Sequence, residues 1–351
     1  MKSSDHARRV TLQDIARRTG YSVTAVSRAL RHKSDIGPEA TAQIQQAAQE
    51  MGYVTNQTAV SLRYGRTNVI TVLLVNLTNP YFSIMSNQLQ IAAQEMGYSL
   101  VIVCSQDDPD LELELAEQAI ARHSDGVMLF PTVHSGPAID RLRAAGIPLV
   151  LLSSEMEPYQ LDCVLPDDEA GAHLATLHLA QEGCRRLAFI SSSNSAPSYL
   201  VRREGFLRAC KELGLDESSH RICDIPDLHR FTTQYLAQPN PLTDQLIRLN
   251  EDGFDGLFVF CDAEAWRVMN AILLCPTLSQ ASFGIVGFDN VDGNLVTPTP
   301  LCSVDCDLGG LARQGIALLH QRIEGDQSPP LVIRMPVHII CRNSCCRGRR
   351  N

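Results

Sequence analysis

The sequence contains no apolar run long enough to cross a membrane. Its apolar stretches, such as residues 72–75 and 147–152, are far shorter than the roughly 20 residues of a transmembrane helix. The first ten residues carry positive charge, but the apolar segment of a secretory signal peptide does not follow them. With 44% hydrophobic and 20% charged residues, the chain has the composition of a globular protein, which we expect to be cytoplasmic.

The sequence also lacks the CxxC motifs of common zinc and redox sites, although it contains 12 cysteines. Their spacing is irregular and no secretory signal is visible, so we expect no disulfide framework and interpret most thiols as small buried side chains. One close grouping is the C-terminal trio Cys341, Cys345 and Cys346, near His338. A metal site at this trio is the alternative, but the spacing matches no common ligand pattern, so we predict no metal.

No enzyme signature is present. The chain has no phosphate-binding P-loop, no GxGxxG dinucleotide motif and no recognisable Ser/His/Asp or Cys/His catalytic set. We interpret the acidic runs Asp107-Asp108 and Asp167-Asp168-Glu169 as solvated helix starts, because carboxylates are favourable beside a helix N-terminus. We therefore predict that the protein is not an enzyme and binds no cofactor.

Basic charge is concentrated at one end of the chain. Residues 1–66 contain 10 lysines and arginines against 5 acidic residues, a net charge of +5. Since the whole chain has 30 basic and 39 acidic residues, the other 285 residues carry 20 basic and 34 acidic groups, a net charge of −14. A basic head on an acidic body indicates that only the head meets a polyanion such as DNA.

The head has the local signals of three short helices. Thr11 and Ser22 are N-cap residues, and Pro38 begins a third helix that ends near residue 52. A small residue at position 16, Gly20 in the turn and an aliphatic residue at position 26 have the spacing of a helix-turn-helix. A structural three-helix bundle would share two of these three constraints, but the basic charge favours DNA binding.

Beyond a polar linker at residues 55–66, apolar strand-like runs alternate with helical segments. The predicted strands are 69–75, 100–104, 127–131, 148–152, 187–191, 257–260 and 283–287, and the predicted helices are 83–96, 111–122, 171–182, 201–213 and 263–273. Continuous apolar strands connected by helices indicate parallel sheets covered on both faces. Because about four strands precede residue 162 and several follow it, two such units in tandem fit better than one very wide sheet.

Several motifs extend along nearly the whole chain. In the head they are the run Val10–Leu30 (VTLQDIARRTGYSVTAVSRAL), Met51-Gly-Tyr53 and Asn56. In the body they are Asn79-Pro-Tyr-Phe82, Asp125-Gly-Val127, Ala145-Gly-Ile-Pro148 and Val286-Gly-Phe-Asp-Asn290. In this order and at this spacing, from about residue 10 to residue 344, the chain resembles the LacI/GalR family of bacterial transcription regulators.

The resemblance implies an α/β protein with an N-terminal all-α helix-turn-helix head and a periplasmic-binding-protein-like body of two α/β subdomains with parallel sheets. The expected parts are a DNA-binding domain at 1–54, a hinge helix or linker at 55–67, an effector-binding and dimerisation body at 68–346 and a basic tail at 347–351. The N-subdomain is expected at about 68–165 and 294–328, and the C-subdomain at about 166–293 and 329–346. The chain would then cross between the subdomains near residues 165, 293 and 329.

In this family the second helix of the head lies in the major groove of DNA. The resemblance therefore implies base contacts from Val23 and Thr24, with Arg28 one turn further on. It implies phosphate contacts from three hydroxyl groups, those of Thr11, Ser22 and Ser27.

The resemblance also implies a hinge helix at residues 56–64 that folds when two hinges pair on the operator. Asn56 and Ala59 match the family here, and Leu62 occupies the position of the wedge that enters the minor groove. Thr55 and Val60 depart from the family pattern and weaken the expected support of the hinge on DNA. An inert linker with an exposed leucine is the alternative.

A ligand cleft between the subdomains, at the carboxyl ends of the strands, is a further implication. The implied effector-binding residues are Tyr81, Phe82, Phe130, Ser153, Arg202, Cys261 and Asp289. The rings suit stacking on a sugar or base, and the charged groups suit polar ligand atoms. Because Cys261 replaces an amide common in the family, we expect a less polar pocket than a typical sugar site. Trp266 either lines this cleft or packs in the core, and we favour packing.

Together these features imply a sequence-specific DNA-binding repressor controlled by a small metabolite, such as a sugar in carbohydrate metabolism. The alternatives are the same regulator answering to a non-sugar metabolite or protein partner, and a solute-binding protein without a DNA role. Since residues 341–351 contain no leucine heptad that would make a tetramer, we predict a homodimer on near-palindromic double-stranded DNA. The sequence names neither the effector nor the operator, and it assigns no role to segment 227–241.

Overall fold

The computed structural model describes residues 10–30, 36–53, 65–192, 196–226, 228, 240–291 and 299–345. The chain divides into two compact units, residues 1–67 and residues 68–351. In the described part of the chain, no helix combines the length and the apolar character that a membrane crossing requires.

The first unit contains the helices α1 (Leu12–Thr19), α2 (Val23–Ala29) and α3 (Pro38–Glu50). As predicted, Thr11 is the N-cap residue of α1, and it forms a capping box with Asp14. Gly20 ends the helix with φ 78°, a left-handed conformation that glycine adopts at little cost. A small apolar core that includes Val26 and Ile44 holds the three helices together.

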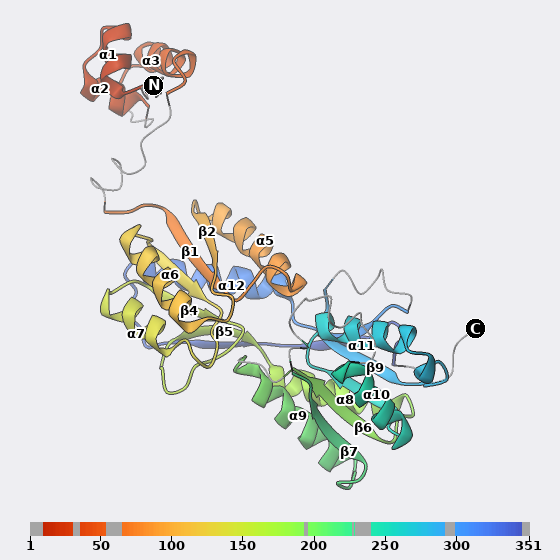
Figure 1. The fold of residues 1–351 in the computed structure, drawn as a ribbon. Coiled ribbons are helices and arrows are strands. Elements are labelled where there is room, and N and C mark those ends of the chain that lie inside the picture. The colour runs from red at the N-terminus through yellow and green to blue at the C-terminus, as the bar shows by residue number, and fades with distance from the viewer. Residues whose placement is uncertain are drawn as a thin grey trace, which may run out of the picture. The chain divides into compact units, whose positions relative to one another are not determined.

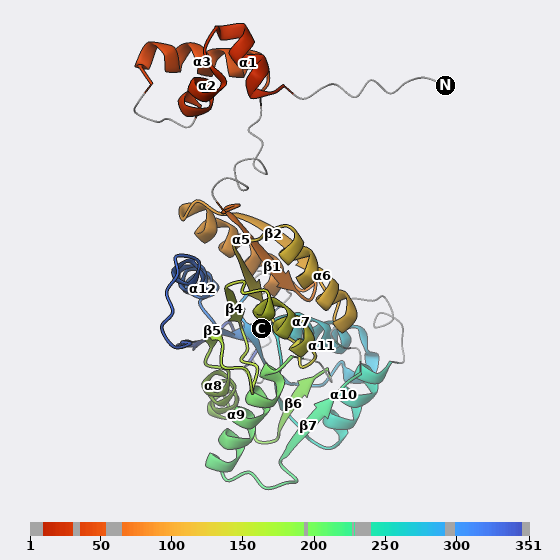
Figure 2. The same cartoon turned by 90° about the vertical axis from the view of Figure 1, so that its left-hand side faces the viewer.

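The second unit begins with a six-stranded sheet in the order β11-β5-β4-β3-β1-β2, in which all neighbouring strands are parallel. Its strands are β1 (Val69–Leu74), β2 (Ser99–Cys104), β3 (Gly126–Leu129), β4 (Leu149–Leu152), β5 (Asp162–Pro166) and β11 (Val332–Met335). The helices α5 (Pro80–Glu95) and α12 (Leu308–Ile323) pack on one face, and α6 (Pro109–Ala121) and α7 (Gly136–Ala144) pack on the other (Figure 1, Figure 2).

The second sheet has the order β12-β10-β9-β8-β6-β7 and is parallel except for the edge pair β10–β12. Its strands are β6 (Leu187–Ser191), β7 (His220–Asp224), β8 (Gly256–Val259), β9 (Gly284–Asp289), β10 (Cys302–Asp305) and β12 (His338–Ile340). The helices α8 (Asp168–Gln181) and α9 (Ser198–Glu212) pack on one face, and α10 (Pro241–Glu251) and α11 (Asp262–Leu274), followed by the short helix η2 (Pro276–Leu278), pack on the other. One apolar core extends through both sheets and joins them.

Along the described strands, the chain crosses between the two sheets three times, and two of these crossings lie later than the sequence predicts. The first follows β5, close to the predicted position near residue 165. Because β10 pairs with β9, the second crossing follows residue 305 rather than residue 293; because β11 pairs with β5, the third follows residue 335 rather than residue 329. Both strands have only four residues, and tertiary pairing rather than a local pattern decides which sheet each one joins.

Candidate DNA-binding and effector sites

The exposed face of α2 carries the residues predicted to read DNA bases. Val23 is 41% exposed, and Thr24 and Arg28 are also exposed, whereas Val26 and Ala29 face the core. The helix therefore presents an aliphatic group, a hydroxyl and a guanidinium on one side. These are chemical groups that contact base edges in the major groove.

Two of the three hydroxyls predicted to contact phosphates also cap helices. Ser22 Oγ accepts the N–H of Ala25 at 3.1 Å. Thr11 Oγ1 accepts the N–H of Asp14 at 3.3 Å and donates its own hydrogen to Asp14 Oδ2 at 2.6 Å. A phosphate contact from the Thr11 hydroxyl would therefore replace its bond to Asp14. Ser27 is half-buried on α2.

The three predicted hinge contacts, Asn56, Ala59 and Leu62, belong to residues 54–64, which lie outside the described residues. Their contacts with DNA therefore stay predictions.

Side chains of the first sheet meet at its carboxyl edge. Tyr81 and Phe82 lie in the first turn of α5, after β1, and Phe130 directly follows β3. The rings pack edge to face, with centroids 5.3 Å apart for Tyr81–Phe82 and 5.5 Å apart for Phe82–Phe130. The Tyr81 hydroxyl also hydrogen-bonds Ser153 Oγ, at the end of β4. Four of the residues predicted to bind the effector thus lie together.

Arg202, on α9, is the centre of a buried charged cluster at the second sheet. Its Nε donates to Asp168 Oδ1 at 2.7 Å, and its Nη1 donates to the carbonyl oxygen of Phe260 at 2.6 Å. Its Nη2 lies 3.7 Å from Asp289 Oδ1, and its guanidinium carbon lies 3.6 Å from the ring centroid of Phe288. All three charged side chains are buried: the exposed fraction is 8% for Arg202, 3% for Asp168 and 6% for Asp289. These contacts hold the guanidinium in one orientation.

Burial dominates the electrostatics of this cluster. It raises the pKa of Asp168 and of Asp289, and the guanidinium of Arg202 opposes both shifts. Burial by itself would lower the pKa of Arg202, but the two carboxylates outweigh it and raise that pKa. Burial also raises the pKa of Tyr81, and the Asp289 carboxylate adds to the rise. Geometry links the two sheets here, because Tyr81 at the first sheet belongs to the same buried apolar cluster as Phe288, against which Arg202 packs.

Asp289 ends β9 in a strained turn. Its φ is 105°, a value that residues other than glycine rarely adopt, and the next residue, Asn290, has a left-handed φ of 51°, which asparagine tolerates. Asp262 holds this turn, because its carboxylate accepts the N–H of Val291 at 3.0 Å and the hydroxyl of Ser303 at 2.7 Å. Strained backbone of this kind concentrates at functional sites, where the surrounding structure enforces it.

The start of α11 adds two buried groups. Cys261 is the N-cap residue of the helix, and Glu264 accepts the hydroxyl hydrogen of Ser192 at 2.6 Å. Burial raises the pKa of Glu264 to about 7, although its hydrogen bonds with Ser192 lower it in part. Trp266 is half-buried and packs against two apolar clusters, one of which also contains the predicted effector residues Phe130 and Cys261, so packing in the core stays a prediction.

Sequence reasoning missed Asp168, Asp262 and Glu264. The prediction that Asp168 is solvated is wrong, because its carboxylate is buried against Arg202. In contrast, Asp108 is exposed and caps α6, as predicted. The available signal was the position of these acids in the first turns of α8 and α11, the helices that follow the buried strands β5 and β8, since the carboxyl ends of parallel strands border ligand sites.

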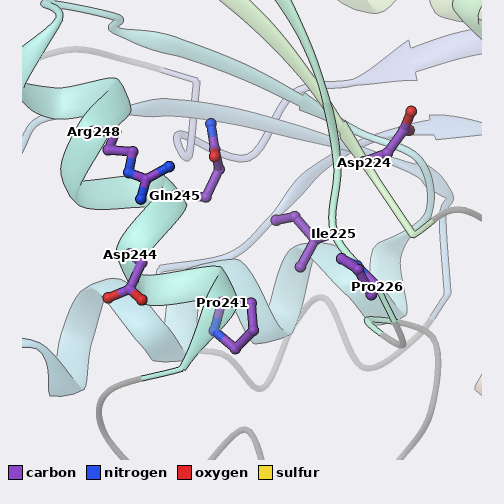
Figure 3. Close-up of a pocket in the computed structure, with 7 residues that line it drawn as sticks. All are labelled: Asp224, Ile225, Pro226, Pro241, Asp244, Gln245 and Arg248. Carbon is purple, nitrogen blue, oxygen red and sulfur yellow. The ribbon is translucent and has the colours of Figure 1, made fainter.

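A separate pocket of about 290 Å³ lies between the end of β7 and α10 (Figure 3). It is lined by Asp224, Ile225, Pro226, Pro241, Asp244, Gln245 and Arg248. None of the residues predicted to bind the effector lines it.

Two protein-family descriptions match this chain, and together they cover most of its length. The family described as "Periplasmic binding proteins and sugar binding domain of LacI family" matches residues 67–342, and "Bacterial regulatory proteins, lacI family" matches residues 11–56. The chain belongs to the LacI family. It is a DNA-binding regulator and not an enzyme, as predicted.

Individual relatives resemble this LacI family member over nearly its whole length. The ribose operon repressor of Halalkalibacterium halodurans is 25% identical over 342 residues, covering 97% of this chain and 98% of the relative. The transcriptional repressor PurR of Pasteurella multocida is 24% identical, covering 95% and 98%.

Solved structures support the predicted fold class. The crystal structure of the Lac repressor dimer bound to operator and the anti-inducer ONPF has a TM-score of 0.82 at 20% identity, covering 97% of this chain and 100% of that one. A LacI family regulator from Enterococcus faecium with bound ribose has a TM-score of 0.67 at 23% identity, covering 80% and 100%. These likenesses confirm a helix-turn-helix head followed by a two-subdomain α/β body.

Proposed function

We propose that the protein is a repressor whose affinity for operator DNA is controlled by a sugar or sugar derivative bound between the two α/β subdomains. The observation that carries this proposal is the buried cluster of Arg202, Asp168 and Asp289, which borders the apolar cluster that contains Tyr81. Two carboxylates against one guanidinium favour a ligand with several hydroxyl hydrogens to donate. The rings beside Tyr81 add an apolar surface for the carbon skeleton of the ligand.

The names of the relatives support this ligand class. Ribose operon repressors of two organisms match most of the chain, and a structural neighbour holds ribose. Relatives named PurR also match, and the apolar side chains of Phe130 and Cys261 leave fewer polar groups than a typical sugar site requires. Nucleobases therefore belong in the test beside sugars.

For the DNA side, we assign base contacts to Val23, Thr24 and Arg28, which α2 exposes together. The hydroxyls of Thr11, Ser22 and Ser27 and the hinge residues Asn56, Ala59 and Leu62 complete the assigned DNA contacts. Two chains pair through their bodies, so that two heads read a near-palindrome. A protein that binds the bacterial chromosome acts in the cytoplasm.

Coupling between the sites follows from the three chain crossings. A ligand that touches both Tyr81 and Asp289 favours one angle between the two subdomains over another. In a paired molecule that angle sets the spacing of the two hinges, which fold on DNA or separate from it. The effector and the operator then change each other's affinity by the same factor.

The test is thermal unfolding of the protein against sugars, sugar phosphates, polyols and nucleobases. A ligand present at a hundred times its dissociation constant stabilises the protein by about 2.7 kcal/mol, which is a readily measured shift. The same compound must then change the affinity of the protein for its operator. A compound that stabilises the protein but leaves DNA binding unchanged would contradict control by an effector.

Two matched substitutions locate the ligand. Asp289→Asn keeps the shape of the side chain and removes its charge, so we expect it to abolish the thermal shift while the protein stays folded. Asp244→Asn makes the same chemical change at the pocket beside α10, and we expect it to leave the shift intact (Figure 3). If Asp244→Asn abolishes the thermal shift and Asp289→Asn keeps it, the ligand binds in the pocket beside α10, which contradicts this proposal.

A further inference from the structure

Four side chains with metal-binding atoms converge at one point of the second sheet. His178 lies in the last turn of α8, Cys302 begins β10, and Cys341 and Cys345 follow β12. Their imidazole nitrogen and three sulfur atoms all lie within 4.8 Å of one another. Residues up to 167 positions apart in the chain therefore supply one compact set of N and S ligands.

The distances between these atoms match the coordination shell of a tetrahedral ion. The Sγ atoms of Cys302 and Cys345 are 3.3 Å apart, those of Cys341 and Cys345 are 3.5 Å apart, and those of Cys302 and Cys341 are 3.9 Å apart. His178 Nε2 lies 3.2 Å from Cys345 Sγ. Sulfur atoms bound about 2.3 Å from one tetrahedral Zn²⁺ lie about 3.8 Å apart, whereas a disulfide bond brings them to about 2.05 Å.

We propose that His178, Cys302, Cys341 and Cys345 bind one Zn²⁺ ion. Three thiolates and one imidazole in tetrahedral arrangement are a common ligand set of structural zinc sites, which have no open coordination position. The ion would join α8, the start of β10 and the C-terminal segment that follows β12. A site of this kind stabilises a fold and performs no chemistry.

The surroundings of the four ligands suit a bound metal. The backbone N–H of Arg342 donates to Cys302 Sγ at 3.0 Å, the type of outer hydrogen bond that orients a thiolate ligand. Ser344 Oγ accepts the N–H of Cys302 at 2.7 Å and donates to the carbonyl oxygen of Ile285 at 2.6 Å, so the segment between the ligands is held against the sheet. Cys302 and Cys345 are buried, while Cys341 is exposed and gives the ion a route from solvent.

The site lies at the opposite end of the sheet from the effector cluster. Cys302 begins β10 and Ile285 lies near the start of β9, whereas Asp289 ends β9. Helix α8 runs between the two ends, with Asp168 at its first turn and His178 at its last, about 15 Å apart at 1.5 Å per residue. We therefore expect zinc to stabilise the body without entering the effector site.

The ligand set differs from the one that the sequence suggests. In the sequence, His338 is the histidine near the C-terminal cysteines, and their spacing predicts no metal. In the structure His338 lies 3.6 Å from Asp305 instead, and the histidine beside the thiols is His178, which precedes the trio by more than 160 residues. Linear spacing therefore does not reveal the ligand set.

The experiment measures zinc by elemental analysis in full-length protein purified and dialysed under reducing conditions. We expect one equivalent of zinc per chain, and a fall in melting temperature when a strong chelator removes it. Replacement by Co²⁺ is expected to give thiolate-to-cobalt charge-transfer absorption from three thiolates. Protein without zinc that also fails to bind added Zn²⁺ would overturn the proposal, as would a disulfide among these three cysteines that persists under reducing conditions.

Substitutions identify the ligands. Cys341→Ser, at an exposed position, and His178→Gln are each expected to lose most of the zinc, and Cys341→Ser to weaken the cobalt band. Cys104→Ser, in β2 of the other sheet, and Cys346→Ser should keep one equivalent. Full zinc content in Cys341→Ser and His178→Gln, or loss of zinc in Cys346→Ser with retention in Cys345→Ser, would overturn this ligand set. Circular dichroism of each variant reports whether it has folded.

Discussion

At the scale of single residues, Glu264 links the stability of the body to pH. Burial raises its pKa in the folded protein to about 7, from an ordinary value of 4.5. The folded state therefore holds this proton more tightly than the unfolded chain does. The stability that the protonated carboxyl contributes is fully present below pH 4.5 and is lost as the pH rises to about 7.

We expect this residue to lower the free energy of unfolding by on the order of 3 kcal/mol across that interval. Glu264→Gln cannot ionise but keeps an oxygen to accept the Ser192 hydroxyl, so the variant should lose this fall and gain stability relative to the wild type as pH rises. Urea unfolding at a series of pH values measures the difference. Glu114→Gln, at an exposed position of α6, is the control and should follow the wild-type profile. Equal pH profiles for Glu264→Gln and the wild type would refute the assignment.

At the scale of elements, the turn between α1 and α2 depends on one backbone conformation. Gly20 has φ 78°, and nothing lies within 4 Å of the position that a Cβ atom would occupy there. A substitution at Gly20 therefore costs free energy because of the backbone conformation and not because the new side chain would clash with its neighbours. Asparagine tolerates this conformation and a β-branched residue does not.

We expect Gly20→Val to destabilise the head by about 1–2 kcal/mol relative to Gly20→Asn. The measurement is hydrogen exchange of the full-length protein, read by mass spectrometry on peptides from α1 and α2. Faster exchange should appear in those peptides of Gly20→Val, and operator binding should weaken with it. Peptides from the body should be unchanged, because residues 68–351 form a separate compact unit. Equal protection in the two variants would show that the turn tolerates other conformations.

At the scale of the whole molecule, charge and pairing determine how the protein meets DNA. The net charge of −9 would repel DNA if it were spread evenly, but the head carries +5 and the remaining chain −14. Attraction through the head alone predicts an affinity that falls steeply as salt concentration rises. Two heads on paired bodies further predict a binding site with twofold symmetry.

Selection from random duplexes should therefore yield an inverted repeat with a flexible pyrimidine–purine step at its centre. Sedimentation should give the mass of two 38.6 kDa chains, without and with the selected duplex. Arg28→Ala should relax the preference at one position of each half-site, whereas Arg17→Ala, on α1, should leave the preference unchanged. An asymmetric consensus or a tetrameric mass would contradict this arrangement.

Features that depend on neighbouring residues can be predicted from the amino-acid sequence. Thr11, Gly20 and Ser22 specify the boundaries of α1 and α2 through hydrogen bonds and backbone angles within a few positions. The alternation of apolar runs with helical segments predicted α5, α6, α8, α9 and α11 and most of the parallel strands, because buried strands need continuous apolar residues. It did not predict α7, α10 or α12. Motif order then indicated the family.

Contacts between residues far apart in the chain depend on how the elements pack in three dimensions. Asp168 resembles a solvated helix start until Arg202, 34 residues later, packs against it, and His178 joins Cys302 and Cys345 only because α8 lies beside β10 and the C-terminal segment. The short strands β10 and β11 likewise join different sheets through pairings that their own residues do not encode. Burial of polar groups depends on these long-range contacts, since a charge is stable in the interior only where the fold supplies its partner.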